Sequence, residues 1–423
     1  MRDILPEDQG FYQKVYEAAA AVAEFYNFQK IDTPILEPAE LFSKGVGAST
    51  DIVEKQMYVF RTRGGDYLAL RPEFTAALTR SYVQHGMFNW PQPVKLYSWG
   101  PLFRLERPQA GRFRQFHQFN LEVFGEQDAV MDVQIIQIFY TFLTNLKFRN
   151  LIIEINSIGD SQCRPYYKKL LTGYFKTRVN SLCADCRRRL KQNPLRVLDC
   201  KEEKCRQIVA QAPQIIDHLC ENCKSHFKEV LEFLDEADLP YHLNPYLVRG
   251  LDYYTKTVFE IFEEAEQGRN SEQGRNPDAL VGGGRYDVLV KMLGGKDTPA
   301  CGGAAGIERV VEAAKEKFKR PVLSPRKVFL AQLGSLAKRK SLKLMEEFRR
   351  AKIPIAESLG KDSLKSQLRI ADKLGAVYAL ILGQKEALEG TIIIRDMRSG
   401  QQWIIKMEKV VNEIKKRIKR IKK

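Results

Sequence analysis

Hydrophobic residues recur at helical spacing near the N-terminus, where the pattern predicts a helix over 10–28. From there to about residue 150, short apolar segments bounded by turn residues predict strands, most clearly at 94–98 and 119–125. These strands do not alternate regularly with helices. We therefore expect an α+β domain around an antiparallel sheet rather than a doubly wound parallel sheet.

The pattern changes over 161–240, where the chain is rich in helical spacing, charge and cysteine. We interpret this stretch as a helical module inserted into the preceding domain. Strand patterns return at 246–262 and 279–281. Between them the sequence Glu-Gln-Gly-Arg-Asn occurs twice, at 266–270 and 272–276, which predicts a duplicated hairpin loop.

The C-terminal part of the chain predicts a separate small α/β unit. Its strands are expected at 328–333, 377–382 and 391–396, and its helices at 338–351 and 362–374. A final amphipathic helix carries one apolar stripe, formed by Met407, Val410, Val411, Ile414, Ile418 and Ile421. The predicted parts are a core of 1–160 and 241–317, the insertion 161–240, a linker 318–326 and the terminal unit 327–423.

The charge of the chain indicates a polyanionic partner. Among its 423 residues 68 are Lys or Arg and 52 are Asp or Glu, a formal net charge of +16. Nucleic acid is the first candidate and a membrane surface the second, and a merely solvated lysine-rich surface is the alternative. The segment from Lys406 to Lys423 holds nine basic residues against two acidic ones, a net charge of +7.

The composition also excludes several classes of protein. Hydrophobic residues make up 44% of the chain, enough for packed cores rather than disorder. No apolar run reaches the roughly 18 residues of a membrane span, and the N-terminus lacks the apolar segment of a secretory signal. Eight cysteines, six of them between Cys183 and Cys223, do not make a disulfide framework. We expect a cytoplasmic protein.

The sequence lacks the Walker phosphate loop, G-x-G-x-x-G, the nucleophile elbow and H-E-x-x-H. Instead, five stretches set arginine or acidic residues beside small ones, at 70–75, 97–119, 247–254, 281–287 and 301–309. Forked arginines clamp phosphates, and phenylalanine rings stack bases. Five such stretches in one chain indicate a pocket for an anionic ligand.

Taken in order, these stretches resemble the class II aminoacyl-tRNA synthetases, and within that class the histidyl-tRNA synthetase family. DTPILE at 32–37 is similar to the first class motif, FRLE at 103–106 to the second and GIER at 306–309 to the third. RGLDYY at 249–254 and GGRYD at 283–287 are similar to two histidine-specific signatures. The resemblance covers essentially the whole chain. It implies a homodimer through the first motif and an anticodon-binding role for the terminal unit.

The resemblance implies a ligase that uses ATP with Mg²⁺. Such an enzyme converts L-histidine to histidyl-adenylate and diphosphate, and then transfers histidine to the 3′-terminal adenosine of tRNA(His). Positioned arginines suit the charge that develops on the phosphate. By resemblance, Arg104 binds the α-phosphate and the attacking carboxylate, and Arg249 lies on the opposite side of that phosphate.

The resemblance also assigns the two substrate sites. In the ATP site, Arg112 and Arg309 hold the outer phosphates, Phe116 and Arg309 enclose adenine, and Glu106 reads its amino group. The implied histidine site consists of Glu73, Thr75, Gln118, Glu122, Arg249, Tyr253 and Tyr254. Its first three residues accept the α-ammonium group, and Glu122 and Tyr254 each take one imidazole nitrogen. An apolar amino acid would leave both of these groups unpaired.

The chain departs from the family pattern in the third motif. Gly303 stands where the family usually has a bulky residue, and Ala305 stands where methionine is common. This departure predicts a roomier floor under the adenine or the histidine.

The cysteine cluster contains two C-x₂-C pairs, Cys183 with Cys186 and Cys220 with Cys223. Paired C-x₂-C is a spacing of structural zinc sites, so these four thiols are candidate zinc ligands. The gap between the pairs is longer than in a compact zinc ribbon, and free cysteines in a helical insertion are the alternative. A redox role is disfavoured because no thioredoxin-like pattern surrounds either pair.

Two other functions compete with the synthetase. A catalytically inactive relative, such as the regulatory subunit of ATP phosphoribosyltransferase, usually lacks the terminal unit and the catalytic arginines, whereas this chain has Arg104, Arg249 and Arg309. A general nucleic-acid-binding module would explain the charge. It would not explain Glu73 and Glu122 in their family positions.

Overall fold

The structure, a computed structural model, describes residues 2–47, 50–106, 111–264, 279–319 and 328–421. The chain divides into two compact units, Met1–Pro321 and Val322–Lys423, and each is described by itself. The division falls inside the segment expected as the linker, 318–326. The duplicated sequence at 266–276 lies outside the described residues.

An eight-stranded sheet forms the centre of the first unit, in the order β1-β5-β6-β11-β10-β9-β7-β8. The strands are β1 (Gln29–Lys30), β5 (Val94–Phe103), β6 (Gln115–Phe124), β7 (Leu151–Ser157), β8 (Tyr241–Leu243), β9 (Thr255–Glu263), β10 (Val281–Arg285) and β11 (Ala300–Gly306). Neighbouring strands are antiparallel except for β1 with β5 and β7 with β8. The expected α+β architecture on an antiparallel sheet is confirmed.

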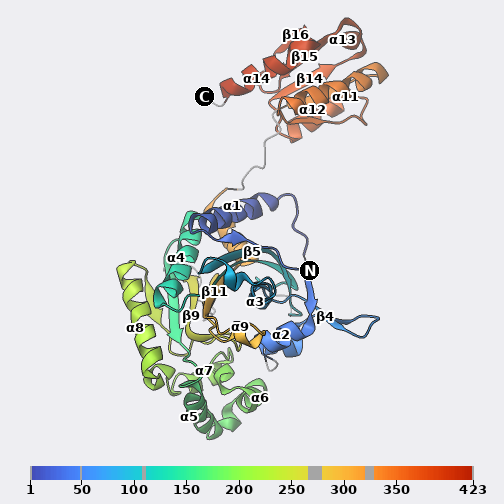
Figure 1. Ribbon diagram of the computed structural model, residues 1–423. Helices are drawn as coiled ribbons and strands as arrows, with labels where there is room; N and C mark the ends of the chain where they lie inside the picture. Colours follow the sequence, from blue (N-terminus) through green and yellow to red (C-terminus); the bar gives the residue numbers. More distant parts are fainter. Residues whose placement is uncertain (1, 48–49, 107–110, 265–278, 320–327, 422–423) are drawn as a thin grey trace. The chain divides into compact units, whose positions relative to one another are not determined.

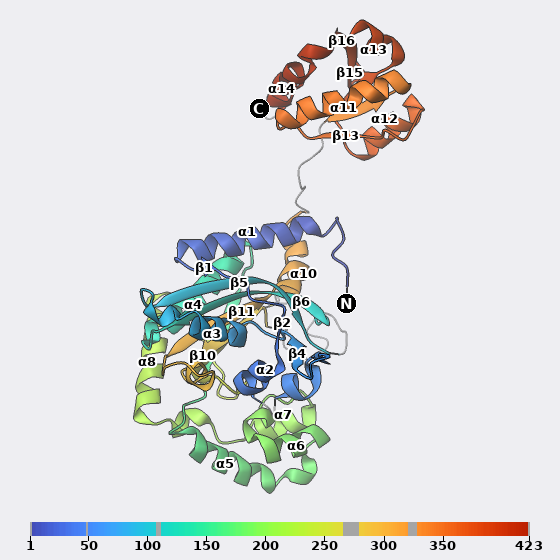
Figure 2. The ribbon, with the colours of Figure 1, turned by 45° about the vertical axis from the view of Figure 1, so that its right-hand side comes forward.

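One face of this sheet is covered by helices α1 (Gln9–Phe25), α4 (Ala129–Asn145) and α10 (Ile307–Lys317), as Figure 2 shows. Side chains alternate along β6, so Phe119, Leu121 and Val123 pack into the core beneath these helices. The residues between them point to the opposite face. Alternation along one strand thus places Asn120 and Glu122 on the face opposite the helices.

The opposite face is enclosed by shorter elements. They are helices α2 (Ala39–Val46), α3 (Thr75–Gln84) and α9 (Leu289–Met292), with a small antiparallel sheet of β2 (Leu36–Pro38), β4 (Tyr67–Leu70) and β3 (Val59–Arg61). A second core lies here and includes Phe74, Phe124 and Tyr286. The sheet therefore separates an apolar layer from a layer that also carries polar side chains.

The insertion forms a helical module with its own core, which Figure 1 shows at the lower end of the first unit. Helices α5 (Arg164–Lys176), α6 (Ala184–Gln192) and α7 (Glu203–Val209) form this core. Its buried residues include Tyr167, Phe175 and Leu190. The last helix of the insertion, α8 (Glu221–Glu236), instead packs against α4 and buries Phe227, Val230 and Leu234 in the main core of the first unit.

Two expected strands differ from the observed structure. The segment 246–254 forms turns, and the strand begins only at Thr255. Leu247, Tyr253 and Tyr254 are buried because they pack beneath neighbouring elements rather than because they alternate in a sheet. The segment 30–36, whose apolar spacing also predicts a strand, is in strand conformation only at its two ends, in β1 and β2.

The second unit contains a five-stranded sheet in the order β13-β12-β14-β15-β16. Its elements are β12 (Val328–Gln332), α11 (Ser335–Arg350), β13 (Ile355–Glu357), α12 (Leu364–Lys373), β14 (Tyr378–Leu382), α13 (Gln384–Glu389), β15 (Thr391–Asp396), β16 (Gln402–Lys406) and α14 (Val410–Ile421). Val410 and Ile414 of α14 are fully buried, which confirms the predicted apolar stripe at these positions. Across both units, no helix among the described residues is long and apolar enough to cross a membrane.

Candidate active site

A buried carboxyl group, Glu122 on β6, lies at the centre of the polar layer. Its Oε1 accepts hydrogen bonds from the Thr75 hydroxyl and from Asn120 Nδ2, the latter at 2.7 Å. Its Oε2 accepts a short hydrogen bond from the Tyr286 hydroxyl. Burial raises the pKa of Glu122 to about 8, although its three donors favour the charged form. Glu122 is therefore protonated at neutral pH unless a basic group enters the pocket.

A second buried carboxylate, Glu73, lies at the start of α3. It accepts hydrogen bonds from the backbone N–H groups of Thr75 and Ala76, at 2.6 and 2.8 Å. These are N–H groups that the first turn of a helix cannot satisfy internally. Burial nevertheless raises the pKa of Glu73 above its usual value. The two carboxyl groups belong to one site because Thr75 contacts both of them.

Glycines of neighbouring strands make room for these side chains. A Cβ atom on Gly302 would lie 1.8 Å from Glu122 Oε2, and one on Gly282 would lie 2.5 Å from Arg249 Nη1. Gly302 pairs with Glu122 across β11 and β6, so a larger residue there would occupy the carboxylate's position. The glycine-rich sequences at 282–284 and 302–303 thus let charged side chains lie flat on the sheet.

Arg104 follows the end of β5 and lies over this layer. Its Nε donates to the Pro72 carbonyl at 2.9 Å, and its guanidinium carbon is 5.2 Å from the centre of the Phe116 ring. Burial lowers the pKa of Arg104, while the charges of Glu106 and Glu73 raise it. Among the described residues, the Pro72 carbonyl is its one hydrogen-bond acceptor, so its Nη1 and Nη2 groups can bind a ligand.

Arg249 reaches the same region from the loop that precedes β9. It pairs closely with Glu260 and lies 6.0 Å from the centre of the Tyr254 ring. Burial lowers the pKa of Arg249, but Glu260, Tyr254 and Tyr253 together outweigh this effect and hold the pKa above its usual value. Its Nε is buried and has no hydrogen-bond partner among the residues that the structure describes. Arg249 thus offers a fixed positive charge with a free donor.

The other predicted ATP-binding residues lie around the β5–β6 connection and the start of α10. Arg112 Nη1 is 3.8 Å from Glu106 Oε2. Arg309 donates to the Ala279 carbonyl at 2.8 Å and approaches the Gly111 carbonyl at 3.4 Å. Both arginines are half-buried, so an entering anion can reach them.

The predicted tyrosines, Tyr253 and Tyr254, are both buried, and their ring centres are 4.7 Å apart. Tyr286 completes the cluster, 5.4 Å from the Tyr253 ring. Sequence analysis named Glu122 but missed its direct partners Tyr286 and Asn120. Tyr286 stands inside the quoted GGRYD sequence, and Asn120 shares the face of β6 with Glu122, so both had a signal that could have identified them.

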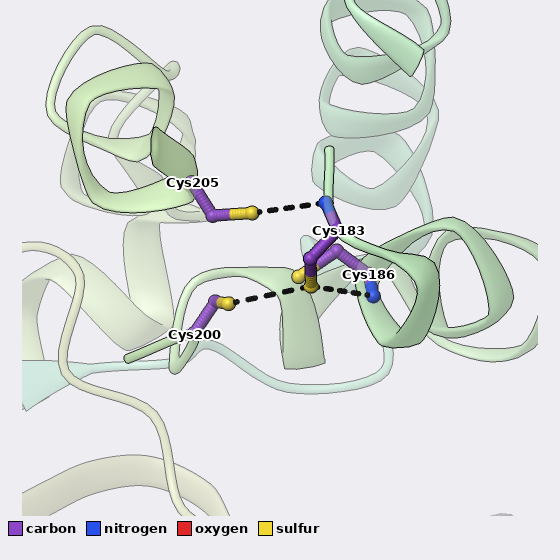
Figure 3. Close-up of side chains that lie close together, drawn as sticks. All are labelled: Cys183, Cys186, Cys200 and Cys205. Atoms are coloured by element: carbon purple, nitrogen blue, oxygen red, sulfur yellow. Dashed lines mark hydrogen bonds between the residues drawn. The ribbon is translucent and has the colours of Figure 1, made fainter. Parts of the chain in front are cut away.

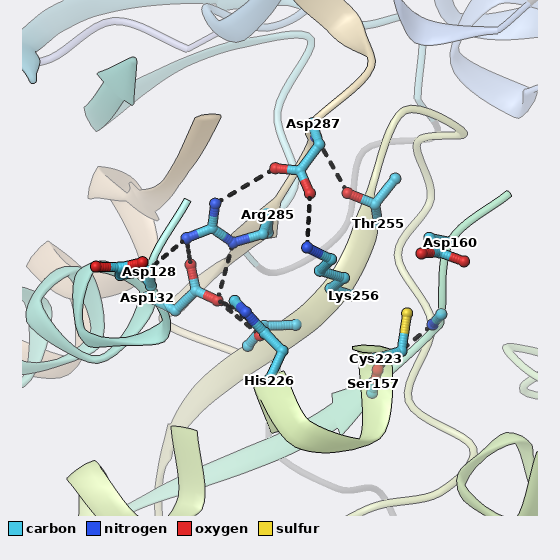
Figure 4. Close-up of polar contacts among 12 residues, drawn as sticks. Asp128, Asp132, Ser157, Asp160, Cys223, His226, Thr255, Lys256, Arg285 and Asp287 are labelled. Atoms are coloured by element: carbon cyan, nitrogen blue, oxygen red, sulfur yellow. Dashed lines mark hydrogen bonds and ion pairs between the residues drawn. The ribbon is translucent and has the colours of Figure 1, made fainter. Parts of the chain in front are cut away.

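Arg285, from one of the five arginine stretches, does not line this pocket. It is fully buried and forms an ion pair with Asp132 at 2.7 Å, as Figure 4 shows. Asp132 also contacts His226 Nε2 at 2.8 Å and accepts from the Thr257 hydroxyl at 2.7 Å. Burial raises the pKa of Asp132, but the contacts with Arg285 and His226 together outweigh this effect and lower the pKa to about 2. This arginine therefore serves the core, contrary to its interpretation as part of a ligand site.

Gly303 does not enlarge the pocket either. A Cβ atom there would lie 2.8 Å from the Phe139 ring and 3.2 Å from the Phe259 ring. These rings belong to the apolar core beneath the helices. The expectation of a roomier floor is corrected, because two phenylalanines fill the space left by the missing side chain.

The cysteines gather in two groups, and not in the one group expected of Cys183, Cys186, Cys220 and Cys223. The first group consists of Cys183, Cys186, Cys200 and Cys205, shown in Figure 3. The second consists of Asp160, Cys163, Cys220 and Cys223. The expectation of a single four-thiol site is corrected, because Cys200 and Cys205 join the first pair and Asp160 and Cys163, which precede both pairs in the sequence, join the second.

Comparisons with known proteins agree with this geometry. The family described as histidyl-tRNA synthetase matches residues 1–161 and 176–310, and the family described as anticodon binding domain matches 327–417. A histidine–tRNA ligase of Dehalococcoides mccartyi is 45% identical over 417 residues, covering 98% of each chain. One from Thermodesulfovibrio yellowstonii is 44% identical and covers 99% of this chain and 97% of its own.

Solved structures give the same result. The crystal structure of apo histidyl-tRNA synthetase from S. aureus is 31% identical, with a TM-score of 0.78 over 98% of this chain and 97% of that chain. A structure from Bacillus halodurans, named as an ATP phosphoribosyltransferase regulatory subunit/histidyl-tRNA synthetase, is 18% identical with a TM-score of 0.61. It covers 90% of this chain and 96% of that chain, and it shares the fold alone.

Proposed function

The chain belongs to the histidyl-tRNA synthetase family, and on that premise we propose that the layer around Glu122 is its histidine-activating site. The protein is a histidine–tRNA ligase. It activates L-histidine with ATP to histidyl-adenylate and diphosphate, then transfers histidine to the 3′-terminal adenosine of tRNA(His). The main support for this assignment is the buried carboxyl group of Glu122, which accepts hydrogen bonds from neighbouring side chains and lies near Arg104 and Arg249.

Recognition of the substrate side chain falls to Glu122. With a pKa of about 8, this group is protonated in the empty pocket, and a cationic partner would lower that pKa. Imidazole, whose own pKa is about 6.5, can enter as imidazolium or can donate from a ring N–H to the carboxyl group. Tyr254 takes the other nitrogen, and Tyr253 supports it. An apolar amino acid of similar size would leave the carboxyl group without a partner.

The α-ammonium group requires acceptors, and we assign it to Glu73, Thr75 and Gln118. Glu73 is fixed by two backbone N–H groups, so its position does not depend on the substrate. Gln118 lies on β6 between Gly100 and Gly306, where the neighbouring glycines leave it room. These three residues hold the substrate so that its carboxylate faces Arg104.

Chemistry takes place between two guanidinium groups. A carboxylate oxygen of histidine attacks the α-phosphorus of ATP, a bond forms between them, and diphosphate leaves with its electron pair. We propose that Arg104 holds the attacking carboxylate and the α-phosphate, and that Arg249 binds the phosphate from the opposite side. Fixed positive charges lower the barrier because the phosphate gains negative charge as the reaction proceeds.

We assign the rest of ATP to residues at the edge of the layer. Phe116 and Arg309 enclose adenine, Glu106 accepts from its amino group, and Arg112 and Arg309 bind the outer phosphates. The family uses ATP with a divalent metal ion. We propose Mg²⁺, which enters with the nucleotide as part of the substrate.

The remaining assignments concern the whole molecule. The protein binds tRNA, histidine and ATP. We propose that 1–160 with 241–317 form the catalytic core, that 161–240 is an insertion and that 318–326 links the core to the anticodon-binding unit 327–423. We further propose a cytoplasmic homodimer joined through 32–37. The match of the anticodon-binding family to 327–417 supports the terminal assignment.

Histidine-dependent exchange between ATP and labelled diphosphate tests the site. The wild type should exchange label, and R249A should lose roughly 3–4 kcal/mol of transition-state stabilisation, a drop of about a hundredfold or more. R350A, which removes an exposed arginine paired with Glu346 in the second unit, is the control and should exchange normally. A wild type without exchange would favour the inactive relative, and full activity of R249A would refute its assigned role.

A further inference from the structure

We propose that Cys183, Cys186, Cys200 and Cys205 bind a structural zinc ion. This ion would hold the insertion against residues 249–254, which we call the histidine-specific loop. Their four sulfur atoms all lie within 4.8 Å of one another (Figure 3). None of the four is in a disulfide. A closed set of four thiolates is typical of structural rather than catalytic zinc, which keeps an open position.

The spacing of the sulfur atoms fits this ion. Zinc–thiolate bonds of about 2.3 Å in a tetrahedron place neighbouring sulfurs roughly 3.8 Å apart. The sulfurs of Cys183 and Cys200 are 3.8 Å apart. Cys186, Cys200 and Cys205 are buried and Cys183 is half-buried, so the centre of the group is shielded from water.

The backbone around the group is arranged as it is around metal-bound thiolates. The N–H of Cys186 donates to the sulfur of Cys183, and the N–H of Cys183 donates to the sulfur of Cys205, both at 3.3 Å. Such donors stabilise negative sulfur, and contacts of this kind orient the ligands of a metal. Cys183 is the N-cap of α6, Cys186 lies in the first turn of α6 and Cys205 lies in α7, so helices position three of the ligands.

The segment between these ligands reaches the candidate active site. Arg189 and Arg196 both bind the Asp51 carboxylate, at 2.9 and 3.0 Å. Asn193 donates to Asp252 at 3.1 Å, within the histidine-specific sequence at 249–254. An ion that fixes both ends of this segment therefore also fixes the loop that carries Arg249.

The second group carries a separate proposal of the same kind. Asp160, Cys163, Cys220 and Cys223 offer one carboxylate and three thiols, again within 4.8 Å of one another. The sulfurs of Cys163 and Cys223 are 3.8 Å apart. We infer that this group binds a second zinc ion, since zinc accepts carboxylate oxygen beside sulfur.

The second group also lies next to the histidine-specific loop. Arg164, directly after Cys163, donates to the backbone carbonyls of Gly159 and Tyr254. The two ions would thus support the same loop from two parts of the insertion. Figure 4 shows Asp160 and Cys223 at the edge of the polar network around Arg285.

Metal content of the full-length protein tests both sites. The protein is purified with a reductant, loaded with zinc sulfate and freed of unbound metal on a desalting column. The wild type should hold two zinc ions per chain, C183S one, C220S one and the double variant none. Serine is the conservative choice, because each cysteine stands at the N-cap of a helix, where serine is favoured.

Each result decides one of the sites. Zinc retained in full by C183S overturns the first site, and zinc retained in full by C220S overturns the second. A wild type that binds no zinc overturns both. Cobalt(II) loaded in place of zinc should give sulfur-to-metal charge-transfer absorption, and its absence would show that bound metal is not held by thiolates. Circular dichroism establishes whether each variant remains folded.

The proposed support of the loop has its own readout, which rests on the proposed function. C183S should raise KM for histidine in the exchange reaction roughly tenfold, because a displaced loop misplaces its binding groups. Its KM for ATP should rise less, because Arg112 and Arg309, which lie outside this loop, are assigned to the other phosphates. An unchanged KM for histidine in a zinc-free C183S would overturn the support of the loop. An inactive wild type would instead overturn the proposed function and leave the metal counts to decide the sites.

Discussion

At the scale of single residues, Glu122 decides the character of the pocket. Three side chains donate to its two oxygens, yet burial still raises its pKa to about 8. A hydrogen-bonded but neutral carboxyl group is poised to ionise when a base arrives. At alkaline pH the empty pocket should lower the free energy of unfolding, because the buried Glu122 carboxylate is then charged and has no positive partner.

Replacing this carboxyl group with an amide should reveal that cost. The unfolded chain releases the proton near the ordinary pKa of 4.5, whereas the folded state keeps it until about pH 8. The wild type should therefore lose roughly 1.4 kcal/mol per pH unit relative to E122Q within that window, and nothing further above it. Thermal melts from pH 5 to 9 measure the difference in Tm between the two proteins.

The control is E17Q on the exposed side of α1, whose Tm should follow that of the wild type at every pH. A constant difference in Tm between E122Q and the wild type would contradict the raised pKa.

At the scale of elements, periodicity predicted the existence of β5, β6 and β12, although β5 continues beyond the predicted end to Phe103 and β6 begins earlier, at Gln115. It failed at 246–254. Leu247, Tyr253 and Tyr254 are buried like strand residues, but they lie in turns and are covered by the second core rather than by neighbouring strands. The spacing of apolar residues predicts that they are buried, but it does not show whether neighbouring strands or other elements bury them.

The sequence also could not predict which distant segments come together in the fold. The two C-x₂-C pairs are the obvious partners along the chain, but α7 and the start of α5 bring other ligands closer. Likewise, the sequence places Tyr286 inside a family signature but does not show that it bonds to Glu122, which is 164 residues away. The resemblance identified the site, and the tertiary fold supplied its partners.

The glycines of β10 and β11 allow a test at this scale. G302A places a Cβ on the Glu122 carboxylate and 2.4 Å from the Leu121 carbonyl. We expect the histidine-dependent exchange to fall more than about tenfold, since the displaced carboxylate no longer meets the imidazole. G360A is the control, because its Cβ would meet nothing within 4 Å. Exchange at the wild-type rate in G302A would contradict the assigned position of Glu122.

At the scale of the whole molecule, the basic residues that make up the excess positive charge have different roles. Arg285 compensates Asp132 in the core, and Arg104 and Arg249 belong to the candidate active site. In α14, Arg417 is also engaged, since it pairs with Glu413 at 2.8 Å and lies 4.0 Å from the Trp403 ring. Lys415, Lys416 and Lys419 of the same helix are exposed and remain for a polyanion.

Reversing these three charges should weaken tRNA binding and its dependence on salt. The logarithm of the binding constant falls as the logarithm of the salt concentration rises, and each lost phosphate contact makes this slope shallower by about 0.7 to 0.9. The slope of K415E/K416E/K419E should therefore be shallower than that of the wild type by roughly two to three. Filter binding of tRNA(His) between 50 and 300 mM salt, about the useful range, measures this slope. K343E/K361E/K365E reverses three other exposed lysines of the unit and should change the slope less. Equal slopes in both variants would contradict a specific role for α14.

The buried ion pair around Asp132 also bears on the order in which the protein is made. The ribosome delivers Asp132 first, His226 next and Arg285 last, 153 residues after the carboxylate that it neutralises. Until Arg285 leaves the exit tunnel, α4 cannot settle on the sheet without burying a charge that lacks its principal partner. The nascent chain therefore completes its central sheet late in synthesis, when most of the catalytic unit has already been translated.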